Sequence, residues 1–229
     1  MNLIGKKFVA SYSGGKDSML AIHRAVNNGL VPIGLITTYS VDSDRSRFHG
    51  MNEDLLRKAS SSLGIPLTYV KTTKSDYAAS FENALMDARE NGAEVCVFGD
   101  IDIKGHLDWC SARCKNTELI PYFPLEHEER KTVVHEFMDF GFSAVIRIVD
   151  TTRLPEVFLG KILSRDVISE VESHGADACG ENGEYHTFVF NGPLFSEKVC
   201  YFEKEIIYHE KYAALNIEGI CSRMAVKGT

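Results

Sequence analysis

Apolar runs and amphipathic segments alternate along the first half of the chain. The runs "KKFVASYS", "LVPIGLITTY", "IPLTYVKT" and "AEVCVFGD" are bounded by polar or turn-forming residues and predict buried strands. Helical spacing of the apolar positions between them predicts helices over residues 17–28, 52–63 and 77–91. This alternation predicts an α/β fold, a Rossmann-like parallel sheet with right-handed crossovers and helices on both faces.

The pattern changes near residue 125. "ELIPYFPL" predicts one more short strand, and the charged stretch "EHEERK" follows its two prolines. Beyond it the spacing predicts a helix over 128–140, a strand at "SAVIRIVD", helical pieces over 155–173, and strands at "YHTFVFNGPLF" and "KVCYFEKEIIYHE". We therefore expect one domain at 1–125 and a smaller α+β domain at 126–229.

Composition limits the location and the partners. The 229 residues are 44% hydrophobic and 25% charged, as in ordinary globular proteins, and no apolar run approaches the roughly 20 residues that span a bilayer. We expect a cytoplasmic protein without a membrane partner. The net charge of -7 argues against nucleic acid as a partner and leaves a homo-oligomer open. The six cysteines form no CxxC pair, so we expect reduced thiols.

The stretch "SYSGGKDS" joins the first predicted strand to the first predicted helix. It lacks both the GxxxxGK[ST] spacing of a Walker A loop and the GxGxxG spacing of a dinucleotide fingerprint. It still predicts an anion site, because glycines allow close approach and the unpaired amides that open a helix attract negative charge. The alternative is a solvated turn in which Asp17 caps the helix. The candidate anion ligands are Ser13, Gly14, Gly15, Lys16, Asp17 and Ser18.

Two further segments carry candidate ligands at the ends of predicted strands. In "GDIDIKGHLDWCSARC", His106, Trp109 and Arg113 share one helical face that could line a substrate cleft. The alternative places Trp109 in the core and Arg113 in solvent. The loop "SVDSDRSRFHGMN" follows the second strand, where open parallel sheets bind ligands, and it carries His49 and Asn52.

The segment "GENGEYHT" places Glu181 and Glu184 around an Asn-Gly pair, directly before a predicted strand. One interpretation is a type I′ hairpin turn, which favours Asn-Gly. The other is a site for a cationic or ammonium-bearing substrate, which two carboxylates and an aromatic ring would attract. Tyr185 and Thr187 complete the candidate substrate-binding residues of this segment.

The string "SGGKDS" resembles the PP-loop of the N-type ATP pyrophosphatases, which cleave ATP between the α and β phosphates. "SRFHGMN", "LGIPL", "LGKIL" and "GENGEYHTFV" are similar to motifs of the diphthine-ammonia ligase family across roughly residues 5–195. The resemblance implies a Rossmann-like nucleotide domain followed by a smaller substrate domain. It also implies amidation of a modified histidine of translation elongation factor two. The match is a variant, because the better known motif has glycine at the position of Asn182 and an acidic residue at that of His186.

From these features we predict an ATP-dependent ligase that forms an amide. A substrate carboxylate, on a small molecule or a modified protein side chain, would attack the α-phosphate, and ammonia or an amine would then displace AMP. ATP and Mg²⁺ are the expected cofactors, with Asp17 as the candidate metal ligand. The alternatives are a PP-loop enzyme that modifies or thiolates RNA and a nucleotide-binding module without turnover. The residues predicted to act in catalysis are Lys16, Asp17, Glu181 and Glu184; His49 is predicted to bind the nucleotide, and Asn52 the substrate.

Overall fold

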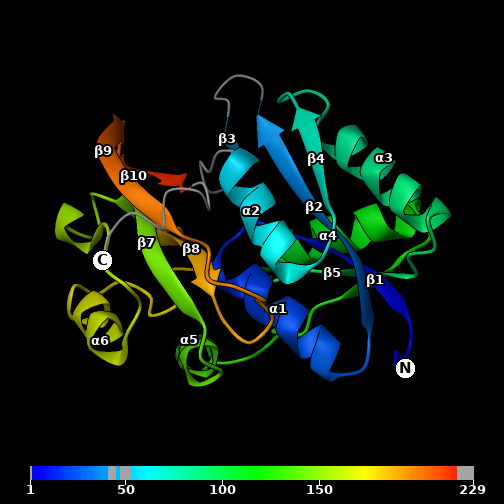
Figure 1. Ribbon diagram of the computed structural model, residues 1–229, viewed down its shortest axis with the longest axis horizontal. Coiled ribbons are helices and arrows are strands. Elements are labelled where there is room, and N and C mark those ends of the chain that lie inside the picture. The colour runs from blue at the N-terminus through cyan, green and yellow to red at the C-terminus, as the bar shows by residue number, and fades with distance from the viewer. Residues whose placement is uncertain (1, 41–44, 47–52, 221–229) are drawn as a thin grey trace.

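The computed structural model of the chain describes residues 2–40, 45–46 and 53–220 (Figure 1). The strands of its first sheet are β1 (Lys7–Ser11), β2 (Val31–Ser40), β3 (Arg45–Ser46), β4 (Leu67–Thr72), β5 (Val95–Val97) and β6 (Ile120–Tyr122). The strands β4, β2, β1, β5 and β6 lie side by side in that order, and all their pairings are parallel. The short β3 pairs antiparallel with the end of β2. The predicted Rossmann-like parallel sheet is confirmed.

Helices cover both faces of this sheet, as the sequence predicts. They are α1 (Lys16–Asn27), α2 (Glu53–Leu63), α3 (Tyr77–Glu90) and α4 (Lys104–Asn116). In β1, Phe8 and Ala10 join the core formed with α1 and α2, whereas Val9 joins the core formed with α3 and α4. The alternation follows from the two-residue period of a strand, whose successive side chains point to opposite faces.

The second half of the chain forms an antiparallel sheet with helices, so the predicted α+β character is confirmed. Its strands are β7 (Ser143–Asp150), β8 (Tyr185–Asn191), β9 (Tyr201–His209) and β10 (Tyr212–Gly219), in the order β8-β7-β10-β9. Its helices are α5 (Arg130–Asp139), the 3₁₀ turn η1 (Glu156–Phe158) and α6 (Arg165–Ser173). The sequence did not predict β10 as a strand of its own.

The two sheets share one continuous apolar core, which includes residues of α1, α2, α5 and all strands of the second sheet except β9. Polar contacts add to this junction. Arg24 of α1 donates from Nε to Oε1 of Glu136 in α5 at 2.9 Å, and the amide of Val189 in β8 donates to the carbonyl of Gly14 at 2.9 Å. The domain boundary that we predict near residue 125 falls between β6 and α5. The parts on either side of it pack against each other through the shared core.

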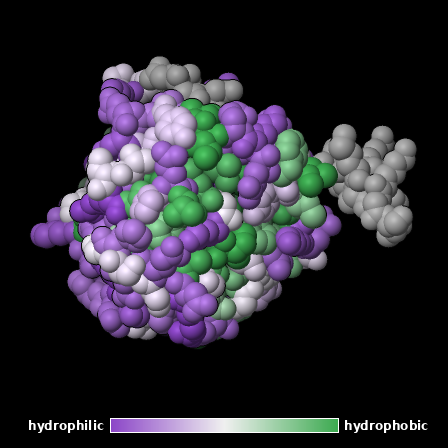
Figure 2. All heavy atoms as spheres, turned by 90° about the vertical axis from the view of Figure 1, so that its left-hand side faces the viewer, coloured by the Kyte–Doolittle hydropathy of each residue, from purple (hydrophilic) through white to green (hydrophobic). Residues whose placement is uncertain are grey.

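The edge strand β9 carries exposed apolar side chains, with Ile206 38% and Tyr208 61% exposed. Figure 2 views the side of the molecule that carries β9 and shows hydrophobic residues gathered between hydrophilic ones. Val157 of η1 is a further exposed apolar residue of the second half. Among the described residues, no helix has the length and apolar character needed to cross a bilayer.

Candidate functional site

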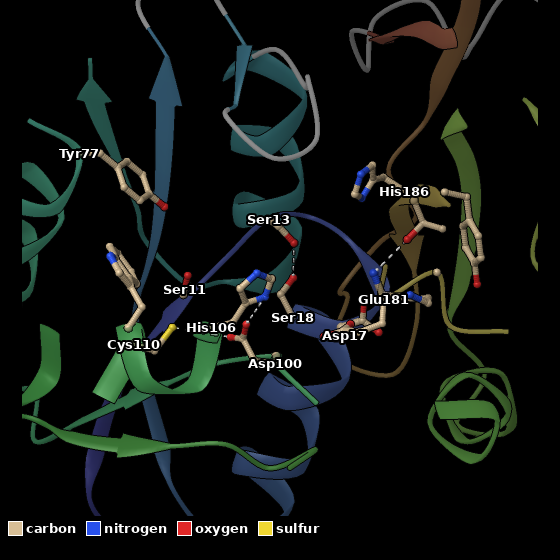
Figure 3. Close-up of a pocket in the computed structure, with 16 residues that line it drawn as sticks. Ser11, Ser13, Asp17, Ser18, Tyr77, Asp100, His106, Cys110, Glu181 and His186 are labelled. Carbon is tan, nitrogen blue, oxygen red and sulfur yellow. Dashed lines mark hydrogen bonds and ion pairs between the residues drawn. The ribbon is translucent and has the colours of Figure 1, made fainter. Parts of the chain in front are cut away.

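A pocket of about 450 Å³ opens where β1 and β5 end and α1 begins. Figure 3 shows Tyr77 at one end of the pocket, Glu181 and His186 at the other, and Asp100 with His106 between them. Both halves of the chain therefore contribute to its wall. This is the carboxyl edge of a parallel sheet, where open α/β proteins bind their ligands.

The turn from β1 into α1 forms the middle of the pocket. Gly14 has φ +77°, a conformation that glycine adopts without strain, and Gly15 is the N-cap of α1. Ser13 and Ser18 lie 3.0 Å apart through their hydroxyls, and the amide of Gly15 donates to Ser13 Oγ at 3.2 Å. Asp17 lies in the first helical turn and is not the N-cap, which argues against the alternative of a solvated turn in which Asp17 caps the helix. The positive end of the helix and these hydroxyls favour an anion here.

Lys16 lies under this turn with only 4% of its surface exposed. Its Nζ is 2.9 Å from Asp17 Oδ2 and 5.2 Å from the centre of the Tyr185 ring. Burial by itself disfavours the charge, but the Asp17 carboxylate and its hydrogen bond raise the pKa of Lys16 well above its ordinary value. The ammonium therefore stays charged, and it lines the pocket beside Asp17.

Among the residues that the structure describes, three acidic side chains line the pocket: Asp17, Asp100 and Glu181. Burial and the charge of Asp17 raise the pKa of Glu181 to about 8. Burial also raises the pKa of Asp100, against the opposing effect of His106, whose Nδ1 is 3.6 Å from Asp100 Oδ1. Raised pKa values in a pocket mark carboxylates that lack enough positive charge nearby.

A divalent cation fits this acidic wall, although the described residues hold no group of three or more metal-binding side chains that would form a cage by themselves. Mg²⁺ usually takes one or two carboxylates and completes its coordination with water and substrate phosphates, so it needs no such cage. Asp17, which the sequence singled out, and Asp100, which it did not, are the carboxylates beside the PP-loop turn. They carry the negative charge that such an ion would offset.

Gly99 sets the distance between the end of β5 and the start of α1. A Cβ at Gly99 would lie 2.7 Å from the carbonyl carbon of Asp17 and 2.7 Å from the amide nitrogen of Ser18. Because both are backbone atoms, no side-chain rotation would relieve the contact. The glycine thus brings Asp100, the next residue, close to the turn that carries Asp17.

The far end of the pocket is aromatic. Trp109 stacks on Tyr77 with ring centres 5.4 Å apart, and Phe81 lies behind it at 5.6 Å. Trp109 and the exposed His106 line the pocket, whereas Arg113 does not. The Arg113 guanidinium lies 5.3 Å from the Trp109 ring, and its Nε is 3.2 Å from Glu82 Oε1. Arg113 therefore supports Trp109 from outside the cavity.

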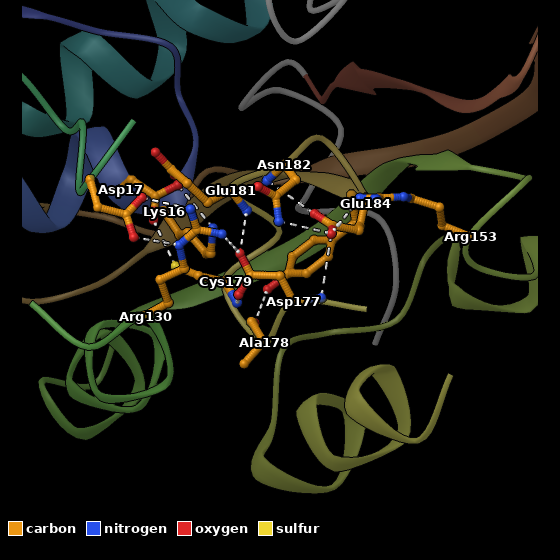
Figure 4. A network of polar contacts seen from close by, with 12 residues as sticks. Lys16, Asp17, Arg130, Arg153, Asp177, Ala178, Cys179, Glu181, Asn182 and Glu184 are labelled. Atoms are coloured by element: carbon orange, nitrogen blue, oxygen red, sulfur yellow. Dashed lines mark hydrogen bonds and ion pairs between the residues drawn. The ribbon is translucent and has the colours of Figure 1, made fainter. Parts of the chain in front are cut away.

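The loop over residues 177–184 brings Glu181 to the pocket and turns Glu184 away from it (Figure 4). Glu184 is 2% exposed, and Arg153 Nη1 donates to its Oε1 at 2.6 Å. Its Oε2 accepts the amide of Asn182 at 3.1 Å. Asp177 accepts the amide of Glu181 at 3.1 Å. Glu184 and Asp177 thus hold the loop that presents Glu181.

This loop follows α6 and joins no preceding strand, so the Asn182-Gly183 turn does not connect a β-hairpin. Tyr185 is 1% exposed and donates its hydroxyl to the carbonyl of Ala178 at 2.7 Å. Burial and the Lys16 charge lower the pKa of His186 to about 4, which keeps its imidazole neutral near pH 7.

Sequence reasoning missed Tyr77, Gly99 and Asp100 as pocket residues. A signal for Asp100 was available, because it lies three residues after the end of the buried strand β5, at the ligand-binding edge of the sheet. Tyr77 opens a helix and carried no comparable signal. His49 and Asn52, predicted to bind nucleotide and substrate, lie outside the described residues.

Comparison with known proteins agrees with this architecture. The family model of the diphthamide synthase N-terminal domain matches residues 6–120, and that of the C-terminal domain matches residues 129–222. Diphthine–ammonia ligase of Homo sapiens is 31% identical over 100 residues, which are 42% of this chain and 38% of the human protein. That alignment therefore spans well under half of the human protein's length. Diphthine–ammonia ligase of Danio rerio is 23% identical over 227 residues, 89% of each chain.

Among solved structures, a predicted subunit of a tRNA methyltransferase from Methanocaldococcus jannaschii is similar with a TM-score of 0.44 and 16% identity. The match covers 80% of this chain and 96% of that chain.

Proposed function

Because the chain belongs to the diphthine–ammonia ligase family, we propose that it is an ATP-dependent ligase that joins ammonia or an amine to a substrate carboxylate. The observation that carries the proposal is the shared pocket. The "SGGKDS" turn at the start of α1 and Glu181 from the second half line the same cavity. A nucleotide and its acceptor can therefore meet there.

In this scheme a carboxylate oxygen of the acceptor attacks the α-phosphorus of ATP. The bond to the β-phosphate oxygen breaks, pyrophosphate leaves, and an acyl-adenylate remains. The nitrogen lone pair of ammonia then attacks the acyl carbon, AMP leaves, and the nitrogen loses a proton. The reaction needs no covalent bond to the enzyme.

We assign the phosphates to the turn at the start of α1. Its backbone at Gly14 and Gly15, the hydroxyls of Ser13 and Ser18, and the helix N-terminus favour the charge of the departing pyrophosphate. Lys16 adds a buried positive charge. Asp17 and Asp100 are the residues that would hold Mg²⁺, which when bound would neutralise phosphate charge.

We assign proton transfer to Glu181. With a pKa of about 8, this carboxyl ionises just above neutrality, and its ionised form can accept a proton from the attacking nitrogen. The reacting carboxyl of the acceptor would lie between the phosphate turn and Glu181, and the rest of the acceptor would extend toward the aromatic end, where Trp109 and Tyr77 stack and His106 lines the cavity. Glu184 acts as a positioning residue, because it holds the loop that presents Glu181.

The test is a product analysis with the purified chain, ATP, Mg²⁺, ammonium and a diphthine-bearing protein, the acceptor that the names of the relatives suggest. The proposal predicts AMP and pyrophosphate in equal amounts, together with an amide on the acceptor. Stoichiometric ADP and phosphate would contradict it. Tight ATP binding without AMP formation, with diphthine and with other carboxylates, would favour the alternative of a nucleotide-binding module.

A further inference from the structure

Thr187 of β8 reaches across from the second sheet to the turn that begins α1. Its Oγ1 accepts the backbone amide of Lys16 at 3.1 Å, and it is 3% exposed. It also lines the pocket beside Lys16 and Ser18. A residue of the second half of the chain is thus built into the turn to which we assign the phosphates.

The hydroxyl of Thr187 still has a proton to donate. A threonine hydroxyl has one proton to donate and can accept two hydrogen bonds. Thr187 accepts from the Lys16 amide, so its own proton must be donated elsewhere, and among the described residues no acceptor receives it. A buried donor without an acceptor costs free energy unless a ligand supplies the acceptor. Thr187 lines the pocket, so a ligand bound there could supply this acceptor.

The position of Thr187 is fixed from both sides. In the sheet it pairs with Ile146 of β7, and two residues further along β8 the amide of Val189 donates to the carbonyl of Gly14 at 2.9 Å. The hydroxyl is therefore held against the turn by backbone contacts, independently of the loop that carries Glu181. Such a fixed donor is suited to an anion that binds the same turn.

We propose that the Thr187 hydroxyl donates a hydrogen bond to a phosphate oxygen of the bound nucleotide. The second sheet then completes the polyphosphate site. In this proposal Thr187 binds the nucleotide and does not bind the acceptor. The proposal rests on the proposed function in one respect only, that the turn binds a polyphosphate.

The test compares Thr187→Val, which keeps the shape and removes the hydroxyl, with Thr187→Ser, which keeps the hydroxyl. Calorimetry would measure the affinity for ATP and for pyrophosphate, each with Mg²⁺, and ligand-observed NMR the affinity for adenosine. We expect Thr187→Val to weaken the binding of ATP and of pyrophosphate at least about tenfold, as for the loss of one charge-assisted hydrogen bond. The affinity for adenosine should be unchanged. Thr187→Ser should stay within about threefold of the wild type.

The matched control is Thr117→Val, since Thr117 is also buried and hydrogen-bonded but belongs to the end of α4. It should leave all three affinities unchanged. Wild-type affinity for pyrophosphate in Thr187→Val would overturn the proposal. So would an equal loss of ATP and adenosine, because that pattern reports a disordered pocket. If the wild-type chain bound neither ATP nor pyrophosphate, the proposed function itself would fail.

Discussion

Nζ of Lys16 lies 2.9 Å from Oδ2 of Asp17, its neighbour in the first turn of α1. The pair is asymmetric, because the Lys16 side chain is 5% exposed and the Asp17 side chain 26%. The ammonium is therefore fixed by the protein interior, while the carboxylate keeps one side toward the pocket. In the proposed function, the Lys16 ammonium would attract a bound phosphate from within the wall of the pocket, and the more accessible Asp17 carboxylate would hold a metal ion.

Lys16→Met should weaken the binding of ATP and of pyrophosphate, because it removes this charge while filling most of the same volume. A charge-assisted contact contributes about 2 kcal/mol, which corresponds to about 30-fold in affinity. Calorimetric titration with each ligand would measure it. Lys6→Met is the matched control, since Lys6 forms an ion pair with Glu94 on the surface and should not affect affinity. Unchanged pyrophosphate binding in Lys16→Met would remove the phosphates from this turn.

Glu181 should make the stability of the protein depend on pH. Its pKa rises from 4.5 to about 8 in the folded chain, so between these values the unfolded chain has lost the proton that the folded chain still holds. Stability therefore falls as the pH rises through this window. Glu181→Gln stays neutral and should escape the fall.

Thermal unfolding without metal or nucleotide would check this expectation. The difference between the thermal midpoints, Glu181→Gln minus wild type, should increase as the pH rises from about 5 to about 8. A difference that stays constant with pH would show that Glu181 ionises normally. In the assay with Mg²⁺ and acceptor, the same variant should form product slowly, because it cannot take the proton from the attacking nitrogen.

The parallel sheet and its order of elements could be predicted from the sequence, because apolar residues form short runs in the strands and recur with helical spacing in the helices. The strand "SAVIRIVD" was placed on the residues that form β7, and the first helix within one residue at each end. The roles of two side chains could not be predicted. Glu184 pairs with Arg153, and Arg113 with Glu82, and such contacts between distant segments leave no local pattern in one sequence.

Glu184→Ala should abolish product formation while ATP affinity stays within about threefold of the wild type. The variant leaves Arg153 and the amide of Asn182 without their acceptor, so the loop that presents Glu181 loses its support. Thr187 should keep its place, because the β7–β8 ladder holds it. Steady-state kinetics and calorimetry on one preparation would separate the two effects.

Arg153→Ala provides the comparison for that variant. Arg153 is 47% exposed at its side chain, and Glu184 keeps its contacts with Asn182 when the arginine is removed, so the loss of turnover should be smaller. Surviving turnover in Glu184→Ala would deny Glu184 any positioning role. A collapse of ATP affinity in the same variant would show instead that the loop and the phosphate site are one unit.

Gly99→Ala and Gly105→Ala should have opposite effects on the free energy of unfolding. A Cβ at Gly99 meets the backbone of Asp17 and Ser18 at 2.7 Å, so β5 and α1 must separate, at a cost of about 1–3 kcal/mol. Nothing lies within 4 Å of a Cβ at Gly105, in the first turn of α4, and replacing a helical glycine by alanine there should stabilise by up to about 1 kcal/mol.

The same pair tests whether the junction of β5 and α1 sets the geometry of the site. Because the added Cβ of Gly99→Ala would displace the amides that open α1, this variant should also bind ATP at least about tenfold more weakly. Gly105→Ala should bind ATP with wild-type affinity. Denaturant titration and calorimetry would give both quantities. If Gly99→Ala kept wild-type stability and ATP affinity, the end of β5 would not abut the turn, and Asp100 would lose its place beside Asp17.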